Sequence, residues 1–329
     1  MKVLVTGGAG FIGSHFVRRL VAAGDDVVVL DKLTYAGNPA NLEGVEAELV
    51  VGDIADPEAV ARAGRGCRAV VNFAAETHVD RSILGPAEFI HTEVLGSQTL
   101  LEWARESGAR YVQVSTDEVY GDLEAGGRSR EDDALRPSSP YAAAKAGGDL
   151  QVLAYVRTYG VNASITRGAN TYGPRQYPEK LIPLFVTNAL DVERLPVYGD
   201  GRQVREWVHA EDHCAAVELV LREGAAGEIY NVGGEDFDNL EVTHRILELT
   251  GADPGLVRHV EDRAGHDRRY ALDDAKLRSL GWQPAHSFGE TGLGQTIDWY
   301  REHRAWWERI KSGEYRAYYE QQYASRLAD

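Results

Sequence analysis

Four side chains in the middle of the sequence have the types and the spacing that proton transfer needs. Tyr141 and Lys145 are four residues apart near the start of an expected helix, which places both on one helical face. A phenol has an ordinary pKa of about 10 and acts as a base near neutrality only beside a cation such as Lys145. Asp117 and Glu118 can supply an acid and a base if their surroundings separate their pKa values.

Each of these residues also has a structural interpretation. A Tyr/Lys pair at this spacing is common by chance on a solvated helix face, and Asp117 can cap a turn while Glu118 faces solvent. The position in the chain favours chemistry, because residues 115–121 end an expected strand. Parallel sheets place their chemistry at the carboxyl ends of their strands.

The elements that would carry these residues alternate along the first half of the chain. Apolar runs at 2–6, 26–30, 50–52, 69–73 and 111–115 are expected strands, and 14–23, 87–107 and 140–159 are expected helices. For the last helix Ser138 and Ser139 are capping candidates, and Gly160 suits a left-handed stop. Unbroken apolar strands between helices predict an α/β fold with a doubly wound parallel sheet covered on both faces.

A glycine-rich turn, residues 6–13, links the first expected strand to the first expected helix. Its glycines, Gly7, Gly10 and Gly13, let the backbone approach a diphosphate while the helix N-terminus offers free N–H groups. Asp31 ends the second strand, where a carboxylate accepts the ribose hydroxyls of NAD and repels the extra phosphate of NADP, although Lys32 softens that choice. The pattern predicts an NAD-binding Rossmann sheet.

The second half of the chain differs in composition and in its expected secondary structure. After about residue 168 it becomes rich in Gly, Pro and Tyr with shorter helices, yet 228–232 again resembles a core strand. We expect residues 1–168 to form the NAD-binding domain, with its core completed by about 206–232. Residues 169–329 would mainly form a smaller α/β portion that binds the substrate. The C-terminal aromatic residues are interpreted as helix packing: Trp299, Trp306, Trp307, Tyr315, Tyr318 and Tyr319.

Composition narrows the possible partners. With 35 basic and 51 acidic side chains the net charge is −16, which disfavours nucleic acid and anionic membrane surfaces. Cys67 and Cys214 are far apart and lack metal-ligand spacing, so neither a disulfide nor a metal site is predicted. The chain begins directly with a strand, and no run is long enough to span a bilayer. These features favour a soluble, cytoplasmic protein.

Several long motifs resemble those of the dTDP-glucose 4,6-dehydratases, a family of extended short-chain dehydrogenases/reductases. They lie at residues 6–13, 74–82, 115–121, 141–145, 178–184, 205–209, 265–267, 299–300 and 306–307. Together they span nearly the whole chain. The resemblance implies a lyase that uses NAD to convert dTDP-glucose into dTDP-4-keto-6-deoxyglucose and water. It also implies a homodimer in which helices 87–107 and 140–159 of two copies form a four-helix bundle.

The resemblance also implies a role for each catalytic residue. Tyr141, assisted by Lys145, accepts the C4 hydroxyl proton while C4 hydride passes to NAD, and Thr116 holds the sugar oxygen. Glu118 then removes the C5 proton and Asp117 protonates the departing C6 hydroxyl, after which hydride returns to C6.

The resemblance implies two groups of binding residues, one for the cofactor and one for the substrate. The cofactor group is Gly7, Gly10, Phe11, Ile12, Gly13, Asp31, Lys32, Thr34, Asp53, Ile54, Ala74, Ala75, Thr92, Tyr141, Lys145 and Thr171. The substrate group is Thr77, Thr116, Asn170, Lys180, Leu181, Pro196, Tyr198, Arg205, Asn239, Arg263 and His266. Arg205 and Arg263 would hold the diphosphate, although each can equally be a structural ion-pair partner. Asp53 can equally cap a helix.

Two positions depart from the family pattern. Family members commonly carry Asn where this chain has Thr171, and Asn where it has Glu93. Thr171 keeps a hydroxyl donor, whereas Glu93 adds a charge near the expected nicotinamide side.

Other functions remain open. A UDP-sugar 4-epimerase or a nucleotide-sugar decarboxylase shares the glycine turn and the Tyr/Lys pair, but an epimerase has no task for Asp117 and Glu118. A non-catalytic NAD-binding regulator needs only the glycine turn and Asp31. Thymine and uracil differ by one methyl group, so the base of the substrate is not fixed by the sequence.

Overall fold

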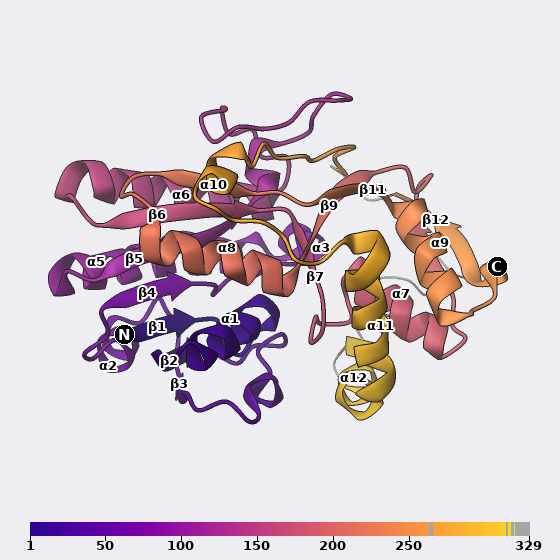
Figure 1. Cartoon of the computed structure of the whole chain (residues 1–329), viewed down its shortest axis with the longest axis horizontal. Coiled ribbons are helices and arrows are strands. Elements are labelled where there is room, and N and C mark those ends of the chain that lie inside the picture. Colours follow the sequence, from indigo (N-terminus) through magenta and orange to yellow (C-terminus); the bar gives the residue numbers. More distant parts are fainter. Residues whose placement is uncertain (263–265, 314, 317–318, 320–329) are drawn as a thin grey trace.

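A computed structural model describes residues 1–262, 266–313, 315–316 and 319 (Figure 1). Within them, a seven-stranded sheet forms the body of the molecule, and each of its neighbouring strand pairs is parallel. Its spatial order is β10 (Ile229–Val232), β6 (Ala163–Gly168), β5 (Arg110–Thr116), β4 (Ala69–Asn72), β1 (Lys2–Thr6), β2 (Asp26–Asp31) and β3 (Glu48–Val51). The chain winds outward in both directions from β1 and β4. Ligands bind outside the carboxyl ends of the strands at such a switch point.

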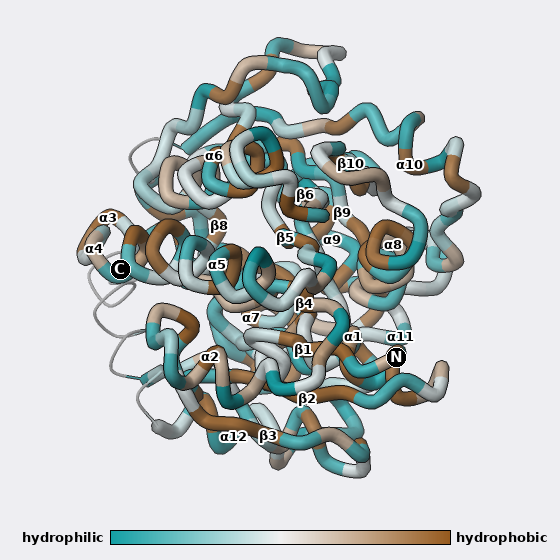
Figure 2. Tube along the Cα trace, turned by 90° about the vertical axis from the view of Figure 1, so that its left-hand side faces the viewer, coloured by the Kyte–Doolittle hydropathy of each residue, from teal (hydrophilic) through white to brown (hydrophobic). Residues whose placement is uncertain are grey.

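Helices cover both faces of this sheet, so the predicted doubly wound α/β fold is confirmed. Figure 2 shows α1 (Phe11–Ala22) and α8 (Ala210–Glu223) on one side, and α2 (Pro57–Ala63), α5 (Ser97–Ser107) and α6 (Pro140–Tyr159) on the other. Alternate side chains of β1 point to opposite faces of the sheet. Val3 and Val5 pack with Phe16 of α1, while Leu4 packs with Leu100 of α5.

The helix α6, which carries Tyr141 and Lys145, has the boundaries that the sequence predicts. Ser139 caps it by accepting a hydrogen bond from the backbone N–H of Ala142 at 3.1 Å, and Gly160 ends it with φ 68°. The other capping candidate, Ser138, hydrogen-bonds Asp267 instead. Local capping interactions therefore fix the ends of the helix that carries Tyr141 and Lys145.

Other boundaries differ from expectation. The single helix expected at 87–107 consists of α4 (Pro86–Ile90), the π-helical turn η2 (His91–Gly96) and α5. The first helix begins at Phe11 rather than at 14, because Gly10 already occupies its N-cap position. Strand β6 was not expected, and the third strand lies two residues before its predicted place.

The rest of the chain forms the portion on the right of Figure 1. Two small sheets, β11–β9–β7 and β12–β8, pack there with several helices. The strands are β7 (Asn170–Tyr172), β8 (Leu195–Tyr198), β9 (Val204–His209), β11 (Glu235–Asp238) and β12 (Val257–Val260). The helices are α7 (Leu181–Leu190), α9 (Asn239–Thr250), α11 (Leu293–Glu302) and α12 (Arg304–Ser312). The short helix α3 (Val79–Leu84) contacts α6, while α10 (Ala275–Ser279) packs against β10 at the edge of the large sheet.

This portion has its own apolar core, to which the C-terminal aromatic residues contribute as predicted. Trp307 and Tyr300 are fully buried, and Trp307 Nε1 donates to the Tyr300 carbonyl at 2.8 Å. Trp299, Trp306, Tyr315 and Tyr319 pack on the same core, while Tyr318 lies outside the described residues.

Cys67 and Cys214 are buried free thiols. None of the described helices is long and apolar enough to cross a membrane.

Candidate active site

Every residue that the sequence assigns to the cofactor lines one long pocket at the carboxyl edge of the large sheet. The pocket runs from the glycine turn and Asp31, past Asp53 and Thr92, to Tyr141 and Lys145. It crosses the ends of β1, β2, β4, β5 and β6, with the β1/β4 switch point at its centre. An extended ligand fits this shape better than a compact one.

The glycine turn is tight enough to exclude side chains. A Cβ atom on Gly13 would lie 2.2 Å from the Gly7 carbonyl oxygen, and one on Gly7 would lie 2.6 Å from the Ala74 nitrogen. Gly7 also has φ 67°, a left-handed conformation that favours glycine. The turn opens directly into α1, whose first N–H groups are free to bind an anion. These residues fit the diphosphate of a dinucleotide.

Asp31 is held at the end of β2, where it lines the pocket. Its carboxylate accepts the backbone N–H groups of Leu33 at 2.8 Å and Ala9 at 2.9 Å, and burial raises its pKa. Lys32 forms an ion pair with Asp53 at 2.9 Å. Lys32 remains 46% exposed in this pair, so its effect on the choice between NAD and NADP stays a prediction. Asp53 accepts the Ala55 N–H in the turn before α2, but the helix cap is Asp56, so the alternative in which Asp53 caps a helix is wrong.

Tyr141, Lys145, Asp117 and Glu118 line the same end of this pocket. Burial raises the pKa of Tyr141 well above its ordinary value, and the negative charges of Glu118, Glu93 and Asp117 raise it further. The Thr116 hydroxyl hydrogen-bonds Tyr141 and opposes that rise. In the free protein Tyr141 is therefore a neutral phenol that needs added positive charge before it can act as a base.

The two adjacent carboxyls have different surroundings. Asp117 is only 3% exposed, and burial, reinforced by the charge of Glu118, raises its pKa from 3.8 to about 8. Glu118 is half-buried and lines both pockets of the site. The turn after β5 is capped by the Thr116 hydroxyl, which accepts the Glu118 N–H at 3.3 Å. The alternative in which Asp117 caps this turn is therefore wrong, and Glu118 is half-buried rather than exposed to solvent.

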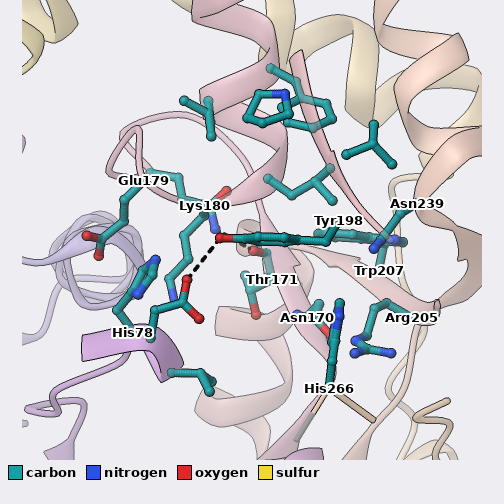
Figure 3. A pocket seen from close by; sticks show the side chains of 18 of the residues that line it. His78, Asn170, Thr171, Glu179, Lys180, Tyr198, Arg205, Trp207, Asn239 and His266 are labelled. Atoms are coloured by element: carbon teal, nitrogen blue, oxygen red, sulfur yellow. Dashed lines mark hydrogen bonds between the residues drawn. The ribbon is translucent and has the colours of Figure 1, made fainter. Parts of the chain in front are cut away.

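A second pocket joins the first at Glu118, Asn170 and Lys180 (Figure 3). Figure 3 shows Glu179, Lys180 and His78 on one side of it, Trp207, Asn239, Arg205 and His266 on the other, and Tyr198 between them. All the described residues predicted to bind the substrate line this pocket or the adjoining end of the first one. Arg263 lies outside the described residues.

Several contacts fix the walls of this second pocket. Lys180 Nζ donates to the Thr77 carbonyl at 2.6 Å, and the Tyr198 hydroxyl donates to Asp80 at 3.3 Å. The Arg205 guanidinium donates to the Val204 and Asp267 carbonyls and lies 4.3 Å over the Tyr270 ring. Arg205 thus has the fixed position that a bidentate anion contact requires.

Sequence reasoning missed some of the lining residues. Asp80, Glu179 and Trp207 belong to the motifs at 74–82, 178–184 and 205–209, so the motifs themselves could have identified them. Glu179 is fully buried and pairs with Arg81 at 3.2 Å. Gln176 lines both pockets and donates to the Thr171 carbonyl, and no pattern in the sequence pointed to it.

The two departures from the family pattern have different settings. Thr171 lines the cofactor pocket, and its hydroxyl hydrogen-bonds His213 Nδ1 at 2.7 Å. Glu93 is fully buried and pairs with Lys145 at 3.1 Å. The Glu93 carboxylate therefore lies next to Lys145, within the protein interior.

Comparison with known proteins agrees with this geometry. A family model described as "NAD dependent epimerase/dehydratase family" matches residues 3–233. The chain belongs to that family. A dTDP-glucose 4,6-dehydratase of Streptomyces niveus is 51% identical over 95% of this chain and 96% of its own length. The resemblance seen in the sequence is thereby confirmed.

Solved structures give the same result. The crystal structure of DesIV, a dTDP-glucose 4,6-dehydratase from Streptomyces venezuelae with NAD and TYD bound, has a TM-score of 0.92. It is 56% identical to this chain and covers 94% of it, with all of the DesIV chain matched. A UDP-glucose 4-epimerase of Thermus thermophilus in complex with NAD has a TM-score of 0.87 and is 36% identical, covering 92% of this chain and all of its own.

Proposed function

We propose that this chain is an NAD-dependent dTDP-glucose 4,6-dehydratase, a hydro-lyase that forms dTDP-4-keto-6-deoxyglucose and water. The observation that carries this proposal is the pair Asp117 and Glu118 beside Tyr141 and Lys145 in one pocket. The similarity to dehydratases along nearly the whole chain supports it. When bound, NAD supplies the oxidation, accepting hydride from C4 of the sugar and returning it to C6.

The chain's own residues carry the first proton. Tyr141 accepts the proton of the C4 hydroxyl, and Thr116, whose hydroxyl faces Tyr141, holds the sugar oxygen. Lys145 lines the same end of the pocket, and its charge, together with that of a bound nicotinamide ring, would oppose the burial that keeps Tyr141 protonated. Formation of the C4 ketone then acidifies the C5 proton.

The carboxyl pair carries out the elimination. Glu118 removes the C5 proton, because it is half-buried and lines both pockets, whereas its neighbour Asp117 is buried. Asp117 is largely protonated at neutral pH and donates its proton to the C6 hydroxyl, which leaves as water. The different burial of neighbouring residues thus assigns one as base and the other as acid.

Substrate binding uses the second pocket. We place the nucleotide between Pro196, Tyr198 and Asn239, the diphosphate near Arg205, and the sugar where the two pockets meet at Glu118 and Lys180. Thr77, Asn170, Leu181 and His266 complete its walls, and Arg263 remains a predicted diphosphate ligand. In this proposal residues 1–168, completed by 206–232, bind NAD, and 169–329 mainly bind the substrate.

The competing functions lack a use for part of the site. A 4-epimerase shares the fold and the Tyr/Lys pair, but it needs neither a base at C5 nor an acid at C6. A silent NAD-binding regulator would need none of Tyr141, Lys145, Asp117 and Glu118. Only the dehydratase uses the carboxyl pair Asp117 and Glu118, whereas the epimerase and the NAD-binding regulator do not.

We further propose a homodimer built on a four-helix bundle. Large apolar side chains are exposed on neighbouring helices: Ile90 of α4 at 57%, Leu95 of η2 at 44% and Leu150 of α6 at 57%. Burying them against a second copy would remove an apolar patch from water. Two buried free thiols suit a reducing compartment, and we propose the cytoplasm as the enzyme's location.

The test is turnover of dTDP-glucose, UDP-glucose and GDP-mannose by the purified chain. Formation of a 4-keto-6-deoxy sugar from dTDP-glucose at the highest kcat/KM supports the proposal. Conversion of UDP-glucose to its C4 epimer without loss of water would assign the chain to the epimerases instead.

A further inference from the structure

Lys145 has a buried counter-ion that the proposed reaction does not use. Its ammonium group lies 3.1 Å from Glu93 Oε2 and donates to the Val114 carbonyl at 2.8 Å. Glu93 is fully buried and Lys145 is 4% exposed. An ion pair this deep costs desolvation, and a well-packed neutral residue often serves stability as well. Stability alone therefore does not explain the charge at position 93.

The backbone is shaped to bring these two side chains together. Glu93 lies in the π-helical turn η2, which packs against α6 at Gly147 and Gly148. A Cβ atom on Gly148 would lie 2.9 Å from the Glu93 carbonyl oxygen, and one on Gly147 would lie 2.9 Å from a Val94 methyl group. Two glycines inside a helix are unfavourable by about 1 kcal/mol each, so this close approach is maintained against helix propensity.

Glu93 lies in a small group of buried charged side chains. Next to the Lys145–Glu93 pair, Asp149 pairs with Arg167 at 2.9 Å, and both are at most 2% exposed. Two buried cations therefore face two buried anions. Three charged groups act on Glu93: Lys145 and Asp149 of α6, and Glu76 after β4. Glu93 in turn acts on Tyr141 of α6 and Tyr111 of β5. Arg167 of β6 pairs with Asp149.

We propose that Glu93 is a positioning residue that acts through Lys145: it holds the ammonium group between η2 and β5, offsets its charge, and sets the pH range in which Tyr141 accepts a proton. The inference rests on the proposed dehydratase function only for the role of Tyr141. Lys145 donates to the Val114 carbonyl and lies at ion-pair distance from Glu93, and its side chain also lines the cofactor pocket.

The direction of the effect follows from the charges. Burial raises the pKa of Glu93 to about 7, and the charge of Lys145 opposes that rise. When Glu93 is ionised, its negative charge raises the pKa of Tyr141. Replacing it with a neutral side chain removes this charge and leaves Lys145 unopposed, so Tyr141 loses its proton at a lower pH.

The main test compares Glu93→Gln with the natural chain in the pH profile of kcat/KM for dTDP-glucose. The acidic limb is expected to lie about one pH unit lower in the variant, the size of a single charge effect across a partly polar interior. Glu93→Asn, which installs the residue common in the resembling family, is expected to shift it in the same direction. Glu106→Gln, which removes an exposed carboxylate from the end of α5, is the matched control and should cause no shift.

A second readout needs no turnover. Infrared difference spectra of the free protein should show a protonated-carboxyl band that titrates near neutral pH and is missing in Glu93→Gln. An unchanged acidic limb in both Glu93 variants, or no band that the substitution removes, would overturn the inference. Failure of the natural chain to dehydrate dTDP-glucose would instead defeat the proposed function, and the infrared titration would still decide the state of Glu93.

Discussion

Asp117→Asn is the substitution for which the structure gives the most quantitative expectation. Burial, and then the charge of Glu118, raises the pKa of the Asp117 carboxyl from 3.8 to about 8. At pH 7 about nine in ten molecules would hold the proton, and at about pH 9 only about one in ten would. If Asp117 protonates the leaving hydroxyl, the elimination rate should fall with an alkaline limb centred near pH 8.

Asparagine keeps the size of the side chain but cannot donate this proton. A positioned general acid contributes about 10²- to 10⁴-fold, so kcat for Asp117→Asn should fall by at least about 100-fold. The residual activity should lose the alkaline limb near pH 8. Product formation measured across the neutral and alkaline range checks both expectations. Turnover at the natural rate, or a limb that persists in the variant, would refute the role of Asp117 as acid.

The same shift has a consequence for stability. A carboxyl whose pKa is raised by folding destabilises the folded state as pH rises above 3.8, and the penalty is complete above about 8. At about 1.4 kcal/mol per pH unit, the full penalty is on the order of 5 kcal/mol. Asp117→Asn should therefore be more stable to urea than the natural chain near pH 9, and the difference should shrink towards pH 4. A difference independent of pH would contradict the burial argument.

Four further predictions follow from the same structure. Glu118→Gln should stall after oxidation of the sugar and show the absorbance of reduced nicotinamide on the protein; normal turnover would remove Glu118 from the reaction. Asp31→Ala should weaken NAD binding about tenfold and reduce the preference over NADP, measured by titration of both cofactors, because the ribose hydroxyls lose their acceptor. Trp307→Ala should lower the free energy of unfolding by roughly 3–5 kcal/mol in urea, because a fully buried ring is lost. Leu150→Glu should convert the proposed dimer into monomers in light scattering, and a monomeric natural chain would contradict the bundle.

Helix ends and tight turns that depend on local interactions could be predicted from the sequence. The cap at Ser139, the left-handed Gly160 and the glycine turn are each decided by a few neighbouring residues. For this reason the helix that carries Tyr141 and Lys145 was predicted to the residue. The cofactor residues collect in one pocket because they all lie at the carboxyl ends of parallel strands, which the alternation of strands and helices already implied.

The remaining features depend on contacts between distant segments. The π-helical turn at η2 is accompanied by close packing against Gly147 and Gly148, some fifty residues later in the chain, and no local pattern marks it. The pairing of Glu93 with Lys145 follows from that packing. The burial that separates Asp117 from Glu118 depends on segments that cover one neighbour and leave the other half-open. The sequence identifies the carboxyl groups of Asp117 and Glu118, but it does not determine which of them is the more exposed.

The most direct test of the central claim follows the hydrogen on C4 of the sugar. With dTDP-glucose carrying deuterium at C4, a single active site that oxidises C4, eliminates water and reduces C6 should deliver the label to C6 of the product. A C4 epimer that still carries deuterium at C4, or a 4-keto-6-deoxy product without deuterium at C6, would contradict the account.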